Sequence, residues 1–192
     1  MEKVFLVDAY ALIFRFYYAF IGRPMRNAAG VNTSAVFGFV KFLKDLILRE
    51  RPHYLGVAFD PPGGNFRHEL YADYKANRSE TPEDIVASVP YIKQVLEAMR
   101  IPVLEIPGYE ADDVIGTLSQ KAAAAGYEVF MVTPDKDYGQ LIRPAVRIYK
   151  QRKGGALACV DFQIGVFVHE GASFCGRGYM QEERGRGLPR FN

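Results

Sequence analysis

The stretch MEKVFLVDAY, residues 1–10, gives the first indication of the fold. Its four consecutive apolar residues, Val4 to Val7, run directly into Asp8. Comparable apolar runs follow at Tyr54 to Phe59, Val103 to Ile106, Val129 to Val132 and Val146 to Tyr149. Continuous apolar runs of this length indicate strands that are buried on both faces, as in a parallel sheet.

Helical patterns occupy the segments between these runs. They extend from Thr33 to Glu50, from Thr81 to Arg100 and from Glu110 to Ala125. In the first helix, the apolar residues predicted to share one face are Val36, Phe37, Val40, Leu43 and Ile47. In the second, Thr81 is the predicted N-cap and Pro82 the first helical residue. The alternation of strand and helix predicts an open α/β sheet with helices on both faces.

Composition limits the class of protein. A chain of 192 residues that is 49% hydrophobic is long enough for one sizeable core, so one domain is expected. The 24 Lys and Arg against 22 Asp and Glu give a net charge of +2, so attraction to a polyanion must come from local patches. Cys159 and Cys175 do not suggest a secreted disulfide scaffold, and no leader or membrane span is evident. A cytoplasmic protein is expected.

The character of the sequence changes after Gly154 and Gly155. Gly-rich and Arg-rich stretches such as CGRGYMQEERGRGLPRFN, residues 175–192, show no sustained helical or strand period. Residues 1–153 are therefore predicted to form the domain, and residues 154–192 a divergent tail that is disordered or poorly packed. Reading-frame slippage or a truncated gene is the leading hypothesis for this tail.

Carboxylates follow the ends of successive predicted strands. They are Asp8, Asp60, Glu110, Asp112, Asp113, Asp135 and Asp137. Ligands of doubly wound sheets bind outside the carboxyl ends of the strands, so we expect these acids along one edge. Two carboxylates about 4 Å apart repel by roughly 4 kcal/mol at an effective dielectric constant of about 20, so such a cluster requires cations. Oxygen-only ligands favour Mg²⁺ or Mn²⁺ over zinc, and two such ions could promote phosphodiester hydrolysis.

Each acid also has a simpler interpretation. Asp8 could cap a helix, the EADD run at residues 110–113 could interact with a helix dipole, and DKD at residues 135–137 could form a solvated turn. The aromatic run near the N-terminus is predicted to be mainly core, with Arg15 and Tyr17 the residues predicted to face a substrate. It consists of Phe14, Phe16, Tyr17, Tyr18 and Phe20.

Four stretches carry a family resemblance. They are VDAYALIFRFYYAF at residues 7–20, FDPPGGNFRHELYADYKANR at 59–78, GYEADDVIGTL at 108–118 and VTPDKDYGQL at 132–141. Together they closely resemble the successive motifs of the polymerase I 5′-3′ exonuclease and flap endonuclease family, over about Met1 to Lys153. The resemblance implies a PIN-like, Rossmann-like fold with a helical arch. It also implies a Mg²⁺-dependent hydrolase that cuts DNA at 5′ ends, nicks or flaps, or cuts RNA primers.

The resemblance also assigns roles to individual residues. Asp8, Asp60, Glu110 and Asp112 would bind the first metal ion, while Asp113, Asp135 and Asp137 would serve the second directly or through water. The segment from Phe66 to Arg78 resembles the base of the arch. There Lys75 and Arg78 would hold the scissile phosphate as catalytic residues, Arg67 would grip the nucleic-acid backbone, and Tyr74 would stack on a base.

The chain departs from the family after this region. The family continues with further sheet elements, two more aspartates for the second metal ion and a helix-hairpin-helix-like element, and none of these is matched. The two-metal site is therefore expected to be incomplete, and the activity reduced or absent. Two alternatives are a non-catalytic module that binds single-stranded or forked nucleic acid, and a PIN-like ribonuclease. The sequence leaves open the oligomeric state and any attached polymerase domain.

Overall fold

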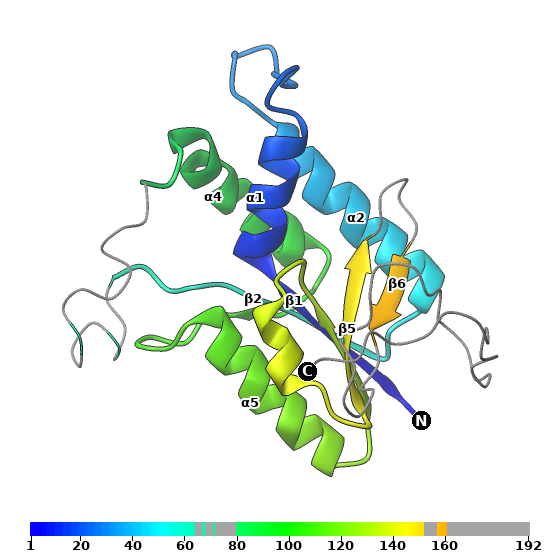
Figure 1. Ribbon diagram of the computed structural model, residues 1–192. Coiled ribbons are helices and arrows are strands. Elements are labelled where there is room, and N and C mark those ends of the chain that lie inside the picture. The colour runs from blue at the N-terminus through cyan, green and yellow to red at the C-terminus, as the bar shows by residue number, and fades with distance from the viewer. Residues whose placement is uncertain (64–66, 68–70, 72–79, 152–156, 161–192) are drawn as a thin grey trace, which may run out of the picture.

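The computed structural model describes residues 1–63, 67, 71, 80–151 and 157–160. These residues build one six-stranded sheet with the strand order β3-β2-β1-β4-β5-β6 (Figure 1). The strands are β1 (Lys3–Asp8), β2 (Tyr54–Ala58), β3 (Val103–Leu104), β4 (Glu128–Val132), β5 (Val146–Gln151) and β6 (Leu157–Val160). The first five are parallel, and β6 pairs antiparallel with β5.

Strand β1 lies at the centre of the sheet. Val7 is paired with Val57 of β2 on one side and with Val132 of β4 on the other. Its residues from Phe5 to Asp8 are all buried. The prediction of parallel strands buried on both faces is thus confirmed, although β3 is two residues long where four were expected.

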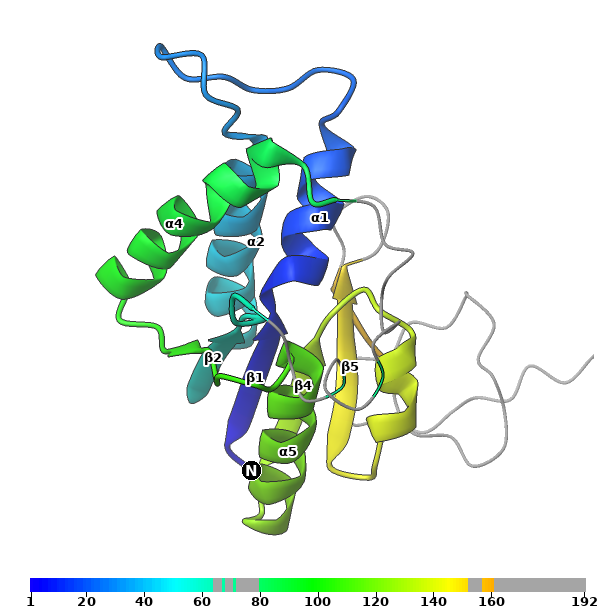
Figure 2. The ribbon, with the colours of Figure 1, turned by 90° about the vertical axis from the view of Figure 1, so that its left-hand side faces the viewer.

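Helices cover both faces of the sheet, as predicted. The helices α1 (Ala9–Ala19), α2 (Ser34–Glu50) and α4 (Glu83–Ala98) pack on one face, and α5 (Ala111–Ala124) packs on the other (Figure 2). Because side chains alternate along a strand, Phe5 and Val7 join the core beneath the first group, and Leu6 joins the core beneath α5. A 3-10 helix, η1 (Asp137–Leu141), completes the second core through Tyr138.

Two details of the predicted helices are wrong. The buried face of α2 is formed by Ala35, Phe39, Phe42, Leu43 and Leu46. Phe37, predicted to belong to that face, is 50% exposed, because the helix is turned so that Gly38 meets α1. Helix α4 begins one residue later than expected, at Glu83, since Pro82 is the N-cap and Thr81 lies outside the helix.

The sheet continues beyond the predicted domain boundary. Strand β6 pairs with β5 from Gln151↔Leu157 to Ile148↔Val160, although it lies in the segment for which no packed structure was expected. The division at residues 153 and 154 stays a prediction, and residues 161–192 lie outside the described part of the chain. Among the helices that the structure describes, none has both the length and the apolar character needed to cross a membrane.

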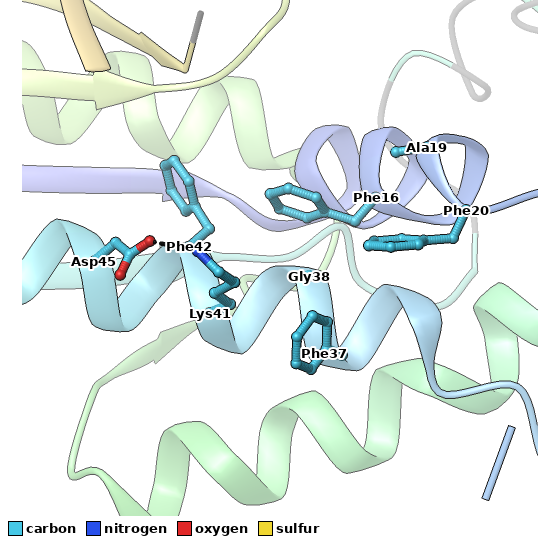
Figure 3. A pocket seen from close by; sticks show the side chains of 8 residues that line it. All are labelled: Phe16, Ala19, Phe20, Phe37, Gly38, Lys41, Phe42 and Asp45. Atoms are coloured by element: carbon cyan, nitrogen blue, oxygen red, sulfur yellow. Dashed lines mark hydrogen bonds and ion pairs between the residues drawn. The ribbon is translucent and has the colours of Figure 1, made fainter. Parts of the chain in front are cut away.

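Helices α1 and α2 pack closely at one point and leave a hollow beside it. The hollow has a volume of about 240 Å³ and is lined by aromatic side chains from both helices, including Phe16 and Phe42 (Figure 3). The ion pair of Lys41 with Asp45 lies at its rim. Gly38 allows the close approach, because a Cβ atom there would lie 2.7 Å from the Cβ and Cγ atoms of Phe16.

We predict that Gly38→Ala lowers the free energy of unfolding by about 1–3 kcal/mol, because Phe16 must move away from the new methyl group. Gly22→Ala is the matched control, since a Cβ atom at Gly22 meets nothing within 4 Å. Urea unfolding of both variants measures the effect. A Gly38→Ala variant as stable as the control would show that the α1–α2 contact has room to relax.

Candidate active site

The direction of the strand order reverses beside β1. Strands β2 and β3 lie on one side of β1, and β4 and β5 lie on the other. In open α/β sheets, the crevice outside the carboxyl ends of the strands at such a reversal is the usual ligand site. Asp8 is the last residue of β1, and Thr133 directly follows β4. These two residues therefore mark the switch point.

Asp8 is a buried carboxylate with three hydrogen-bond donors, and 8% of the residue is exposed. The Ala11 N–H donates to Oδ1 over 3.1 Å, so Asp8 caps α1. The hydroxyls of Thr133 and Tyr138 donate to Oδ2 over 3.2 and 3.1 Å. Burial raises the pKa of Asp8 to about 6, the charge of Asp60 adds to the rise, and the hydrogen bonds oppose it.

Asp60 connects β2 to the start of α5. Its Oδ1 accepts a hydrogen bond from the N–H of Ala111, the first residue of α5, over 2.7 Å. Its negative charge raises the pKa of Asp8 and contributes to the raised pKa of the half-buried Tyr10, where burial is the larger cause. Asp60 thus stands close enough to Asp8 for the two carboxylates to interact.

The EADD run forms the N-terminus of α5. Glu110 is the N-cap and is 7% exposed, and it forms a capping box with Asp113. In that box the Glu110 N–H donates to Asp113 Oδ2 over 3.1 Å. Burial raises the pKa of Asp112, and the charges of Asp113 and Glu110 raise it further. The helix-dipole interpretation of this run is therefore correct in geometry, and like charges still gather there.

Arg67 neutralises part of this acidic group. Its guanidinium donates to Oδ2 and Oδ1 of Asp113 over 2.7 and 2.6 Å, a bidentate pair. Its Nη1 also lies 3.9 Å from Glu110 Oε2. The residue that was predicted to grip a nucleic-acid backbone is thus positioned at the acidic edge of the sheet.

Asp135 and Asp137 are exposed and shape the turn after β4. The Asp135 N–H donates to Thr133 Oγ1 over 3.1 Å, and the Asp137 N–H donates to Asp135 Oδ1 over 2.9 Å. These bonds agree with the simpler interpretation of a solvated turn. The turn leads directly into η1, which brings Tyr138 back to Asp8.

Tyr138 donates a hydrogen bond to Asp8 and lies within reach of the charges of Asp112 and Asp60. The sequence analysis did not single it out. It is 4% exposed, and burial together with the charges of Asp8, Asp112 and Asp60 raises its pKa. Its hydroxyl therefore stays protonated and remains a hydrogen-bond donor to Asp8. Thr133 and Tyr138 both lie within the motif VTPDKDYGQL, but no pattern in that motif separates them from their neighbours.

The donor chemistry suits a hard divalent cation, while the acids are not gathered around a metal position. All the candidate ligands are carboxylates, and burial raises the pKa of Asp8 and of Asp112. Within the described ranges, however, no group of three or more His, Cys, Asp and Glu is arranged to hold a metal ion. Lys75, Arg78 and Tyr74, and most of the predicted arch, lie outside the described residues.

We predict that Asp8→Asn raises thermal stability in metal-free buffer near neutral pH. The folded-state pKa of Asp8, about 6, exceeds its ordinary value of 3.8, so its favourable contribution is present at low pH and is lost as pH rises through 6. Asn does not titrate, and its Oδ1 can keep the bond from the Ala11 N–H, while its Nδ2 must donate to the Thr133 and Tyr138 hydroxyls, which can also accept. The advantage should therefore grow between about pH 4 and about pH 6, to the order of 1–3 kcal/mol.

Thermal unfolding in EDTA at about pH 4.5 and about pH 7.5 measures this difference. Asp45→Asn serves as the control, because Asp45 pairs with Lys41 on the surface, away from the sheet edge. If the stability of Asp8→Asn relative to the wild-type protein does not rise from about pH 4.5 to about pH 7.5, the burial cost is contradicted.

Comparison with known proteins identifies the fold and the family. Residues 3–163 match the model of the 5′-3′ exonuclease, N-terminal resolvase-like domain. The T5 D15 protein co-crystallised with metal ions superposes with a TM-score of 0.58 at 22% identity, covering 81% of this chain and 56% of that one. The T5 5′-exonuclease with bound zinc gives a TM-score of 0.59 at 20% identity, covering 81% of this chain and 57% of that one. At these identities the likeness concerns the fold.

The sequence relatives are closer. The chain is 39% identical over 148 residues to a 5′-3′ exonuclease of Aquifex aeolicus, covering 77% of this chain and 50% of the relative. It is 44% identical over 143 residues to a DNA polymerase I of Chloroflexus aurantiacus, covering 74% of this chain and 15% of the polymerase. The chain thus spans half the length of the first relative and a small part of the second. The resemblance carried by the four motifs is confirmed, and the chain belongs to the 5′-3′ exonuclease family, through its N-terminal resolvase-like domain.

Proposed function

We propose that this chain is the metal-binding part of a 5′-nuclease that hydrolyses phosphodiester bonds at 5′ ends, nicks or flaps of DNA, or in RNA primers. The observation that supports this best is the burial of Asp8 at the switch point, where the charge of Asp60 adds to the cost. The donors to Asp8 are hydroxyls and an amide, which stabilise a carboxylate less than a cation does. A divalent cation would compensate this burial most directly.

Mg²⁺ or Mn²⁺ is the proposed cofactor. Asp8, Asp60, Glu110 and Asp112 are proposed as the first ligand group from their motif positions. In support, the charge of Asp60 acts on Asp8 and that of Glu110 acts on Asp112. Asp113, Asp135 and Asp137 are proposed to serve a second ion. When bound, the ions would supply an activated water and stabilise charge on the leaving oxygen. The protein's own part is to hold the carboxylates along one edge of the sheet.

Arg67 is proposed to bind the substrate backbone. A guanidinium binds carboxylates and phosphates with the same bidentate geometry. Arg67 now pairs with Asp113, so a cation that neutralised Asp113 would release the guanidinium for a phosphate group. Lys75 and Arg78 are proposed from their motif positions to hold the scissile phosphate, and Tyr74 to stack on a base.

A second candidate is a module that binds single-stranded or forked nucleic acid without cutting it. It is favoured by the finding that the acids in the described part of the chain are not arranged around a metal position. Incubating 5′-labelled flap DNA, nicked duplex and unstructured RNA with the protein in Mg²⁺ or in EDTA separates the candidates. Cleavage of flap DNA that EDTA abolishes supports the nuclease, and salt-sensitive binding without cleavage supports the module. Preferential cleavage of RNA would indicate a PIN-like ribonuclease.

For the nuclease, we predict that Asp60→Asn weakens Mn²⁺ binding at least about tenfold, since even residues that only support a ligand have effects of that size. Cleavage of flap DNA should fall in parallel. Calorimetric titration with Mn²⁺ and a gel assay measure the two effects, with Asp45→Asn as a surface control of the same charge change. Wild-type Mn²⁺ affinity in the Asp60→Asn variant would exclude Asp60 as a ligand.

We also predict that Lys75→Ala lowers the cleavage rate by about 10²–10³-fold and leaves Mn²⁺ affinity nearly unchanged, because a cation on the phosphate stabilises developing charge. Lys121→Ala, which removes an exposed lysine from α5, is the control. Single-turnover cleavage with saturating protein isolates the chemical step from DNA binding. A Lys75→Ala variant that cleaves at the wild-type rate would remove this residue from the proposed site.

A further inference from the structure

We infer that Tyr138 is a positioning residue for Asp8: its hydroxyl, together with that of Thr133, holds the Asp8 carboxylate in one orientation for cation binding. This inference rests on the proposed function, in which Asp8 binds the cation. Tyr138 is not itself proposed as a cation ligand. Its hydroxyl acts only as a hydrogen-bond donor to Asp8.

The geometry fixes Asp8 from three directions. The Tyr138 hydroxyl comes from η1, the Thr133 hydroxyl from the end of β4, and the Ala11 N–H from the first turn of α1. The two hydroxyls share Oδ2, and the amide holds Oδ1. Rotation about either side-chain torsion of Asp8 would break bonds on both oxygens, so the carboxylate plane is set by the protein before any ligand arrives.

The ring of Tyr138 is suited to this task because it cannot move freely. It is buried in the second core cluster with residues of β1, β2, β4 and α5, among them Leu6, Ala58 and Ala111. Ala111 also donates its N–H to Asp60. The same core therefore fixes the donor of Asp8 and the donor of Asp60, and it sets the two carboxylates relative to each other.

Hydrogen bonds within the turn before η1 hold the Thr133 and Tyr138 hydroxyls beside Asp8. Thr133 Oγ1 accepts the Asp135 N–H while it donates to Asp8, and Asp135 Oδ1 accepts the Asp137 N–H. The chain from Thr133 to Tyr138 thus forms a short bridge that leaves β4 and returns to Asp8. Removing the Tyr138 hydroxyl alone should loosen Asp8 without disturbing this bridge or the core.

The test is Tyr138→Phe in the full chain, which keeps the ring and removes the hydroxyl. We expect Mn²⁺ affinity, measured by calorimetric titration, to fall about tenfold, as it does when residues that orient metal ligands are removed. Tyr91→Phe is the matched control, because Tyr91 is 49% exposed on α4. Unchanged affinity in Tyr138→Phe would overturn the inference, and tighter binding would also overturn it, since the hydroxyl would then compete with the cation.

A second arm works without metal and separates this inference from the proposed function. Thermal midpoints of the wild-type protein, Tyr138→Phe, Asp8→Asn and the double variant are measured in EDTA. Non-additive shifts would show that the hydroxyl acts on Asp8, and additive shifts would contradict it. A wild-type protein that binds no Mn²⁺ would refute the proposed function, and the cation-binding part of the inference with it, whatever the thermal cycle shows.

Discussion

A carboxylate almost removed from water, at the end of the central strand, is the constraint around which the rest of this structure is arranged. Asp8 ends β1, which pairs with β2 and with β4, so its position is set by the whole sheet. An amide and two hydroxyls reduce the cost of its burial, and Asp60 increases that cost. A buried charge at the switch point of an α/β sheet is the observation on which the proposed cation site rests.

Local pattern was sufficient for the parallel part of the sheet and its helix layers, but not for the antiparallel strand β6. Apolar runs and helical periods depend on neighbouring residues, so the parallel strands, the layers and the edge on which the acids lie followed from the sequence. The partners of the acids did not, because Thr133 and Tyr138 are 125 and 130 positions from Asp8. The exposed Phe37 was misplaced for a related reason: an α2 surface rich in apolar residues allows several buried faces, and the contact of Gly38 with Phe16 selects one.

The simpler interpretations of the acids hold in the structure and are compatible with the proposed functional one. Asp8 caps α1, Glu110 and Asp113 form a capping box, and Asp135 forms a turn. Each of these contacts uses part of a carboxylate and leaves lone pairs for a ligand. Arg67 balances Asp113 in the structure, and under the proposed function the same guanidinium would bind a phosphate group. Under the proposed function, Asp8 and Glu110 would serve both as helix N-caps and as cation ligands.

The distance along the chain between Asp8 and its hydroxyl donors bears on how the protein folds. The entropic cost of closing contacts across 125 and 130 positions must be met before they form, so parallel pairing over such distances is slow. Helix α1 and its aromatic residues can pack with the nearby α2 early. The environment of Asp8 is complete only after β4 and η1 have docked. During synthesis on the ribosome, Asp8 would therefore lack its two hydroxyl donors until Tyr138 had left the exit tunnel.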